Sequence, residues 1–149
     1  MPTKRQDLGQ FGEKIVCQLC TCPRCKRSKT LKRLPTNFKC ADLICDFCGF
    51  LGQVKASTAV DVTEVPRQLL GAAWGPQKER MDAGIYFPLY LVLVTPDQRS
   101  HAIYYLSADL QPPELFTPRK PLGPYARRAG WCGFLYQLQT VQKRLVRLV

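Results

Sequence analysis

The chain has 149 residues, enough to bury a hydrophobic core without disulfides, and we expect one domain spanning residues 1–149. Its 22 lysines and arginines against 11 acidic residues give a formal net charge of +11, which favours a polyanionic partner. No apolar stretch is long enough for a membrane span, and residues 1–7 lack the apolar core of a secretory signal peptide. We therefore expect a cytoplasmic protein with no membrane partner. No basic amphipathic helix is evident either, which favours nucleic acid over an anionic membrane.

The first half of the chain is predicted to hold two helices and two strands. Residues 4–19 are typical of a helix that runs into the first cysteines, and residues 20–33 of a loop rich in Cys, Lys and Arg. Residues 37–56 are predicted to form two strands joined by a cysteine-containing turn. Residues 66–82 favour a helix, because Pro66 suits its first turn.

The second half of the chain is predicted to consist mainly of strands. Residues 87–94 form a nearly continuous apolar run, which is typical of a strand covered on both faces. Residues 101–106 are expected to form another strand, and residues 111–128, with five prolines, a long ordered loop. Strands are expected again at 131–138 and 144–149. Strands interleaved with helices indicate an α/β or α+β fold.

The eight cysteines are concentrated in the first third of the chain, and nothing in the sequence indicates the oxidising compartment that disulfides need. Two Cys-x-x-Cys turns are separated by 19 residues, which is zinc-ribbon spacing. Each turn presents two thiolates, so that two turns complete a tetrahedron around one zinc ion; a redox pair and chance spacing are the alternatives. We expect a zinc-binding subregion at about residues 17–50, with the ligands Cys22, Cys25, Cys45 and Cys48.

Cys17 and Cys20 form a third Cys-x-x-Cys pair that competes with the first knuckle for the zinc. We favour the knuckle, because Cys-Pro-x-Cys followed by basic residues is its usual form and Cys17 suits the apolar face of the preceding helix. The remaining cysteines, Cys40 and Cys132, are interpreted as small buried residues. A zinc ion held by four cysteines has no open position for substrate, so any chemistry must lie elsewhere.

One acidic, one amide and one basic side chain flank the second knuckle. Asp42 precedes the knuckle, and Gln53 and Lys55 follow it. If the knuckle is the tip of a hairpin, Gln53 and Lys55 share one strand face and Asp42 faces them from the other strand. Hard oxygen ligands beside a lysine suit magnesium-dependent cleavage of a phosphodiester. The alternative is a solvated hairpin face without chemistry.

A group of basic residues lies in the proline-rich loop expected at residues 111–128. Arginine and lysine in such a loop suit contacts with DNA phosphates or guanine edges, and prolines reduce the entropy lost on ordering. A merely solvated basic loop is the alternative. The expected DNA-binding residues are Arg119, Lys120, Arg127 and Arg128.

Residues 119–133 read Arg-Lys-Pro-Leu-Gly-Pro-Tyr-Ala-Arg-Arg-Ala-Gly-Trp-Cys-Gly. This segment resembles the Arg-Lys-Pro-Leu-x-Pro-x-Ala-Arg-Arg-Ala-Gly-Trp-x-Gly stretch of the DpnI-type, methyl-directed restriction endonucleases. The resemblance covers about residues 10–149. Four further segments fall into register with the family: Glu13, Cys22-Pro-Arg-Cys25, Ala41-Asp42 before the second knuckle, and Gln53-Val54-Lys55 on the family's Glu-x-Lys.

The resemblance implies a restriction-endonuclease-like fold of the PD-(D/E)xK type: a mixed central sheet flanked by helices, with a small zinc-ribbon insertion. It implies that Asp42 is the central magnesium ligand, Gln53 the second ligand position and Lys55 the catalytic lysine. It also implies an accessory acid at Glu13. Gln53 departs from the family's glutamate, which removes one negative charge from the expected magnesium site.

The function indicated is that of a magnesium-dependent deoxyribonuclease with a structural zinc ion. Its expected partner is double-stranded DNA, and the family resemblance implies cleavage directed by adenine methylation. Two alternatives stay open. The chain could be a catalytically inactive module that binds modified DNA, which the Gln53 substitution favours. It could also be a zinc-ribbon protein that acts within a larger nucleic-acid complex.

Overall fold

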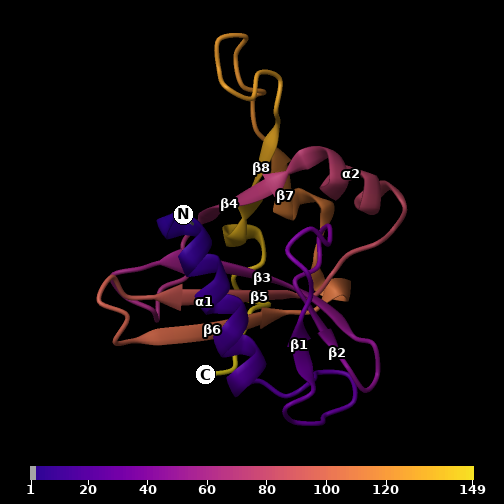
Figure 1. The fold of residues 1–149 in the computed structure, drawn as a ribbon, viewed down its shortest axis with the longest axis vertical. Helices are drawn as coiled ribbons and strands as arrows, with labels where there is room; N and C mark the ends of the chain where they lie inside the picture. Colours follow the sequence, from indigo (N-terminus) through magenta and orange to yellow (C-terminus); the bar gives the residue numbers. More distant parts are fainter. Residues whose placement is uncertain (1–2) are drawn as a thin grey trace.

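The computed structural model describes residues 3–149 of the chain (Figure 1). Its helices are α1 (Lys4–Leu19) and α2 (Trp74–Asp82), with short 3-10 turns η1 (Ala108–Leu110), η2 (Pro113–Leu115) and η3 (Leu138–Thr140). Its strands are β1 (Leu31–Arg33), β2 (Leu43–Cys45), β3 (Leu51–Thr58), β4 (Gln68–Ala73), β5 (Leu89–Val94), β6 (His101–Leu106), β7 (Phe116–Pro118), β8 (Gly133–Gln137) and β9 (Val146–Arg147). No described helix is both long and apolar enough to cross a membrane.

The central sheet is mixed, as expected. Its six strands lie in the order β1-β2-β3-β5-β6-β9. β3 and β5 run parallel, and every other neighbouring pair is antiparallel. Helix α1 covers one face, and the second sheet, β4-β8-β7, packs against the other (Figure 1). The α/β fold with a mixed sheet is therefore confirmed.

Helix α1 begins as its sequence predicts. Thr3 and Gln6 form a capping box, in which the Gln6 N–H donates to Thr3 Oγ1 over 3.2 Å and the Thr3 N–H donates to Gln6 Oε1 over 2.8 Å. Gly12 faces β3, and a Cβ there would lie 2.9 Å from the Cβ of Ala56. The helix therefore lies close against the sheet, over the strand that carries Gln53 and Lys55.

Strand β5 is buried on both faces, which confirms the prediction from its apolar run. Leu89, Leu91 and Leu93 point into the core shared with the second sheet. Tyr90 and Val92 point into the core beneath α1. All six residues of the strand are buried, so β5 contributes side chains to both hydrophobic cores, one on each face of the sheet.

The helix predicted at 66–82 is correct only in its second half. Residues Gln68–Ala73 form β4, which pairs with β8 through Leu69↔Tyr136 and Leu70↔Leu135. Gly71, which weakens a helix, here allows close packing, because a Cβ at that position would lie 2.4 Å from the Phe134 ring. A pairing partner distant in the sequence outweighed local helix preference.

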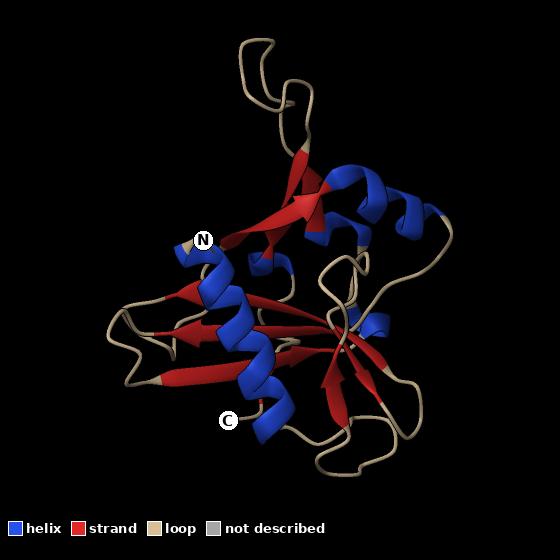
Figure 2. Cartoon of the chain, in the orientation of Figure 1, coloured by secondary structure: helices blue, strands red, loops and turns tan. Residues whose placement is uncertain are grey.

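Two short strands were also missed. β1 lies within the segment expected to be a loop, and β7 lies within the expected proline-rich loop at 111–128. Both are three residues long and both lie at the edge of a sheet, so their local apolar pattern is weak. The rest of the proline-rich segment stands out from the body between β7 and β8 (Figure 2).

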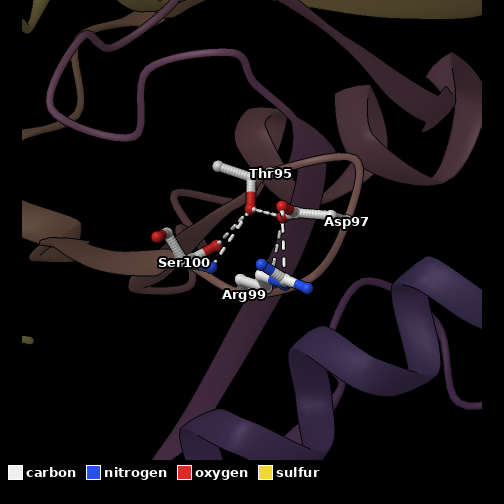
Figure 3. Close-up of polar contacts among 4 residues, drawn as sticks. All are labelled: Thr95, Asp97, Arg99 and Ser100. Carbon is white, nitrogen blue, oxygen red and sulfur yellow. Dashed lines mark hydrogen bonds and ion pairs between the residues drawn. The ribbon is translucent and has the colours of Figure 1, made fainter.

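The turn between β5 and β6 is closed by its own side chains (Figure 3). Asp97 Oδ1 accepts from Thr95 Oγ1 over 2.7 Å and from the Arg99 N–H over 3.0 Å. Thr95 Oγ1 in turn accepts from the Ser100 N–H over 3.1 Å. These bonds lower the pKa of Asp97, with the Thr95 hydroxyl as the main cause. The cluster is explained by turn closure and sets the register of β5 against β6.

Candidate active site and metal centre

The two knuckles form matching turns. The Lys26 N–H donates to the Cys22 carbonyl over 2.9 Å, and the Gly49 N–H donates to the Cys45 carbonyl over 2.9 Å. Lys26 and Gly49 each follow the second cysteine of a knuckle, and both adopt a left-handed backbone, with φ of 66° and 81°. This shared turn directs both thiols of each knuckle to one side.

The four knuckle cysteines form one cluster. The ligand sulfurs of Cys22, Cys25, Cys45 and Cys48 all lie within 4.8 Å of one another. Cys22 Sγ lies 3.5 Å from Cys48 Sγ, and Cys25 Sγ lies 3.7 Å from Cys45 Sγ. A tetrahedral ion with zinc–sulfur bonds of about 2.3 Å spaces its sulfurs about 3.8 Å apart. The cluster therefore fits a metal ion such as zinc.

One thiol of the cluster is tuned toward the thiolate form. Burial raises the pKa of the Cys45 thiol, but its hydrogen bonds with the Thr30 hydroxyl and with the N–H groups of Cys48 and Phe47 have a larger opposite effect and lower the pKa to about 6. Since metal ions bind the thiolate, these hydrogen bonds favour the ligand form of Cys45 near neutral pH.

The remaining cysteines lie outside this cluster. Cys17 packs against the core beneath α1 and Cys20 is buried, and burial raises the pKa of both thiols, that of Cys20 to about 11. The structure therefore groups the knuckle cysteines and places Cys17 and Cys20 outside their cluster. The expectation that Cys40 and Cys132 are buried is wrong, because both are half-exposed. Cys132 Sγ donates to the Arg119 carbonyl over 2.9 Å, and Cys40 lines a cavity.

A cavity of about 390 Å³ lies beside the second knuckle, between the 36–42 segment, β3, and the junction of β4 with α2. Asp42, Gln53 and Lys55 all line it. The structure thus brings together the three residues that the hairpin argument predicted to converge. The other lining residues are Thr36, Asn37, Phe38, Lys39, Cys40, Val54, Ala72, Ala73, Pro76, Gln77, Phe134 and Tyr136.

The backbone of the hairpin sets this arrangement. The Asp42 N–H donates to the Gly52 carbonyl over 2.8 Å, which places Asp42 across from the start of β3. The Val54 N–H donates to Asp42 Oδ2 over 2.7 Å and so holds the carboxylate against that strand. Gln53 and Lys55 are two residues apart in β3, while the Val54 side chain between them packs into the core beneath α1.

Burial shifts the pKa of two charged groups of the cavity, Asp42 and Lys55. It raises the pKa of Asp42, opposed by the hydrogen bond from the Val54 N–H and by the charge of Lys55. It lowers the pKa of Lys55, opposed by the charge of Asp42. An acid and a base whose pKa values are shifted toward each other in one cavity are typical of functional sites.

Gln53 is held by an aromatic partner from the second sheet. The Tyr136 hydroxyl donates to Gln53 Oε1 over 2.7 Å. Burial raises the pKa of Tyr136, so the hydroxyl stays protonated and keeps donating. Gln53 Oε1 retains one lone pair, and Asp42 Oδ1 makes no side-chain hydrogen bond within residues 3–149. These two oxygens are the donors that the cavity offers to a hard divalent cation.

Glu13 lies on α1 and does not line the cavity. Its Oε1 lies 3.7 Å from Nε of Arg33. Burial, followed by the charge of Asp42, raises the pKa of Glu13. The glutamate is therefore close enough to Asp42 to affect its electrostatics, while its nearest partner is a basic residue of β1.

The predicted DNA-binding residues are exposed in the loop between β7 and β8, which Figure 1 shows projecting from the molecule. The Arg128 guanidinium lies 4.5 Å from the centre of the Trp131 ring. The loop begins at the cavity wall, because β8 carries Phe134 and Tyr136 and the Trp74 N–H of α2 donates to the Cys132 carbonyl over 2.8 Å. The basic loop therefore extends from the same wall that holds Gln53.

Sequence reasoning missed two side chains of this cavity. Tyr136 is 83 residues from Gln53, and no local pattern connects them. Gln77 lies in the predicted helix, where its burial was not evident. A period-2 reading of residues 133–137 would have placed Phe134 and Tyr136 on the face opposite Leu135.

A mixed α/β fold with a four-cysteine insertion beside an Asp/Gln/Lys cavity is consistent with a restriction-endonuclease-like nuclease core. A scan against known families matches residues 3–146 to DpnI, the Dam-replacing family. The match covers nearly the whole chain, and the protein belongs to this family. Membership classes it with restriction endonucleases, which are nucleases that act on DNA. A search of curated proteins finds no match.

Proposed function

We propose that this protein is a magnesium-dependent endonuclease that hydrolyses phosphodiester bonds in duplex DNA at adenine-methylated sites. The observation that carries the proposal is the convergence of Asp42, Gln53 and Lys55 on one cavity in a member of the DpnI family. The net charge of +11 and the exposed basic loop support a DNA partner.

The side chains of the cavity have separable roles in this reaction. Asp42 Oδ1 and Gln53 Oε1 would hold the divalent cation, which neutralises charge on the phosphate and makes a nearby water more acidic. The Val54 N–H and the Tyr136 hydroxyl keep the two side chains in place. Lys55, whose pKa is lowered by burial, would orient the attacking water or stabilise the charge that builds on the phosphate.

The four-cysteine cluster would hold a structural zinc ion. Its four thiolates leave no position for water or substrate. Cys45 ends β2, and Cys48 comes shortly before β3, so the ion would fix the hairpin on which Asp42 and Gln53 stand.

The test is cleavage of matched plasmids, adenine-methylated and unmethylated, by zinc-loaded protein with magnesium or manganese. We expect cutting of the methylated plasmid alone. Asp42→Ala should reduce cutting by a thousandfold or more, on the order of 4 kcal/mol in the barrier, because no other carboxylate lines the described cavity. Asp109→Asn, an exposed acid in η1, is the matched control and should cut as wild type does.

Each other outcome has a defined meaning. Cutting of both plasmids would support the cavity as the active site but would show that cleavage does not depend on methylation. Full activity of Asp42→Ala would show that the cavity is not the active site. No cutting of either plasmid would reject the nuclease proposal.

A second function is favoured by one observation, the neutral Gln53. Magnesium sites usually use one or two carboxylates, so a cavity with a single carboxylate is at the lower limit for binding the cation. Such a protein could bind methylated DNA without cutting it. Tight binding of the methylated duplex by a protein that cuts neither plasmid would establish this function.

A further inference from the structure

Gln77 is a buried amide without a partner. It is 6% exposed, and its side chain makes no hydrogen bond within residues 3–149. Gln111, the other buried glutamine, is 8% exposed and donates from Nε2 to the Phe87 carbonyl over 2.8 Å. The amide of a largely buried residue usually has a protein partner, so the difference between the two glutamines calls for a functional reason.

The amide of Gln77 faces the cavity that holds Asp42 and Lys55. Gln77 lines this cavity, and the only fully enclosed side-chain N or O atom without a partner in the described residues is the Tyr90 hydroxyl. The amide group of Gln77 is therefore not sealed in the core. The cavity is the space to which it opens.

The N-terminus of α2 reaches the same cavity. Ala73, the N-cap residue, and Pro76 in the first turn both line it, and no side chain caps this end of the nine-residue helix. The Trp74 N–H donates to the Cys132 carbonyl and Pro76 has no N–H, while the Gly75 N–H has no backbone partner within residues 3–149. An uncapped helix N-terminus carries partial positive charge and favours anions.

We propose that the N-terminus of α2 and the Gln77 amide form a phosphate subsite, which holds a backbone phosphate of the DNA beside the phosphate that is cut. Identifying the phosphate as part of DNA rests on the proposed function. Lys39 lines the same cavity and adds positive charge. Asp42, Gln53 and Lys55 lie across the cavity from α2, on the hairpin, so the two groups of residues can hold different parts of one strand.

A phosphate suits this site better than a base edge does. The amide Nε2 can donate to a phosphate oxygen, and the helix dipole favours the negative charge. Such a contact does not depend on DNA sequence. Gln77→Leu should therefore weaken binding equally for a methylated target duplex and for a duplex of unrelated sequence.

The experiment compares Gln77→Leu with Gln111→Leu by fluorescence anisotropy on both duplexes, without added magnesium. We expect Gln77→Leu to bind both duplexes roughly 10- to 100-fold more weakly, the range for removal of a hydrogen bond to a charged group. Its melting temperature should stay close to that of wild type, because the substitution removes no hydrogen bond within the described residues. Gln111→Leu should show the reverse: a lower melting temperature and unchanged affinity.

Salt dependence separates the neutral contact from a charged one. Gln77→Leu should leave the slope of log K against log salt unchanged, because an amide releases no counterion. Lys39→Met should flatten the slope by about 0.9 if its ammonium neutralises one phosphate. Unchanged affinity of Gln77→Leu, or a loss confined to the methylated target, would overturn the phosphate subsite.

An NMR titration with inorganic phosphate makes the test independent of nuclease activity. Saturable shifts of the Gln77 side-chain amide and the Gly75 backbone amide are expected for the zinc-loaded protein, with no DNA present. If these shifts are seen in a protein that cuts no DNA, the phosphate subsite is supported and the proposed nuclease function is rejected. Absence of the shifts in a protein that does cut would reject the subsite alone.

Discussion

At the scale of single residues, the proposed chemistry depends on Gln53, which stands where the family resemblance implies a glutamate. Gln53 supplies one neutral oxygen to the cavity, and Tyr136 already donates to that oxygen over 2.7 Å. The remaining negative charge comes from Asp42, whose pKa is raised by burial. Cation affinity is therefore expected to be weak and to increase with pH as Asp42 ionises.

Gln53→Glu should lower the magnesium concentration needed for half-maximal cutting by about tenfold, because a carboxylate adds charge where the cation binds. The Tyr136 hydroxyl can still donate to a carboxylate oxygen, so the fold should be retained. The measurement is cutting rate against magnesium concentration. Gln137→Glu, on the same strand as Tyr136 but outside the cavity, is the control. An unchanged or higher magnesium requirement would argue against Gln53 as a ligand.

At the scale of elements, the second cysteine knuckle and the hairpin proposed to be catalytic are one unit. β2 and β3 pair only through Leu43↔Gly52 and Ile44↔Leu51, which is too short a ladder to hold two side chains rigidly. The four-cysteine cluster closes the end of this hairpin. Loss of the metal should therefore disorder the cavity as well as the knuckle.

Cys48→Ser should remove the bound zinc, lower the melting temperature by about ten degrees, on the order of 3–5 kcal/mol, and abolish cutting. Cys17→Ser is the matched control, since Cys17 lies outside the cluster and is only half-buried. It should keep one zinc ion per chain. Zinc content by elemental analysis and thermal melting measure both effects. A Cys48→Ser protein with full zinc content and wild-type melting would show that the cluster is not the metal site.

At the scale of the whole molecule, positive charge is placed far from the core. The loop between β7 and β8 extends beyond both sheets (Figure 2) and carries four of the chain's 22 basic residues. Its attachment next to the cavity suggests that DNA held by the loop would also pass Asp42. The +11 charge of the molecule would speed the first encounter with DNA.

Replacing both Arg127 and Arg128 by alanine should weaken duplex binding and reduce the salt slope by up to about 1.8, which is 0.9 for each phosphate that is no longer neutralised. Both residues are exposed, so the melting temperature should stay within a degree or two. Arg99→Ala, in the turn of Figure 3, is the control and should leave the slope unchanged. A double variant with the wild-type slope would show that the loop does not contact phosphates.

The local sequence pattern predicts some helices and strands correctly and others wrongly. α1 and β5 follow from a capping box and an unbroken apolar run, both of which act over neighbouring residues. β4 was mistaken for helix because its partner, β8, lies more than sixty residues further along the chain. The convergence of Asp42 with Gln53 could be predicted, since both flank one turn. The Tyr136 contact could not, because it joins two sheets.

The sequence by itself determined the four-cysteine cluster, the convergence of Asp42, Gln53 and Lys55 on one hairpin, the doubly buried β5 and the family to which the chain belongs. Each is encoded in residues close together or in a motif long enough to be specific. Only the tertiary structure decided that the second face of the central sheet is covered by β4, β7 and β8, and that Tyr136 and Gln77 meet the hairpin across one cavity. Contacts between distant segments depend on how two cores pack against β5, and a local pattern shows which residues share a face but not which distant segment covers that face.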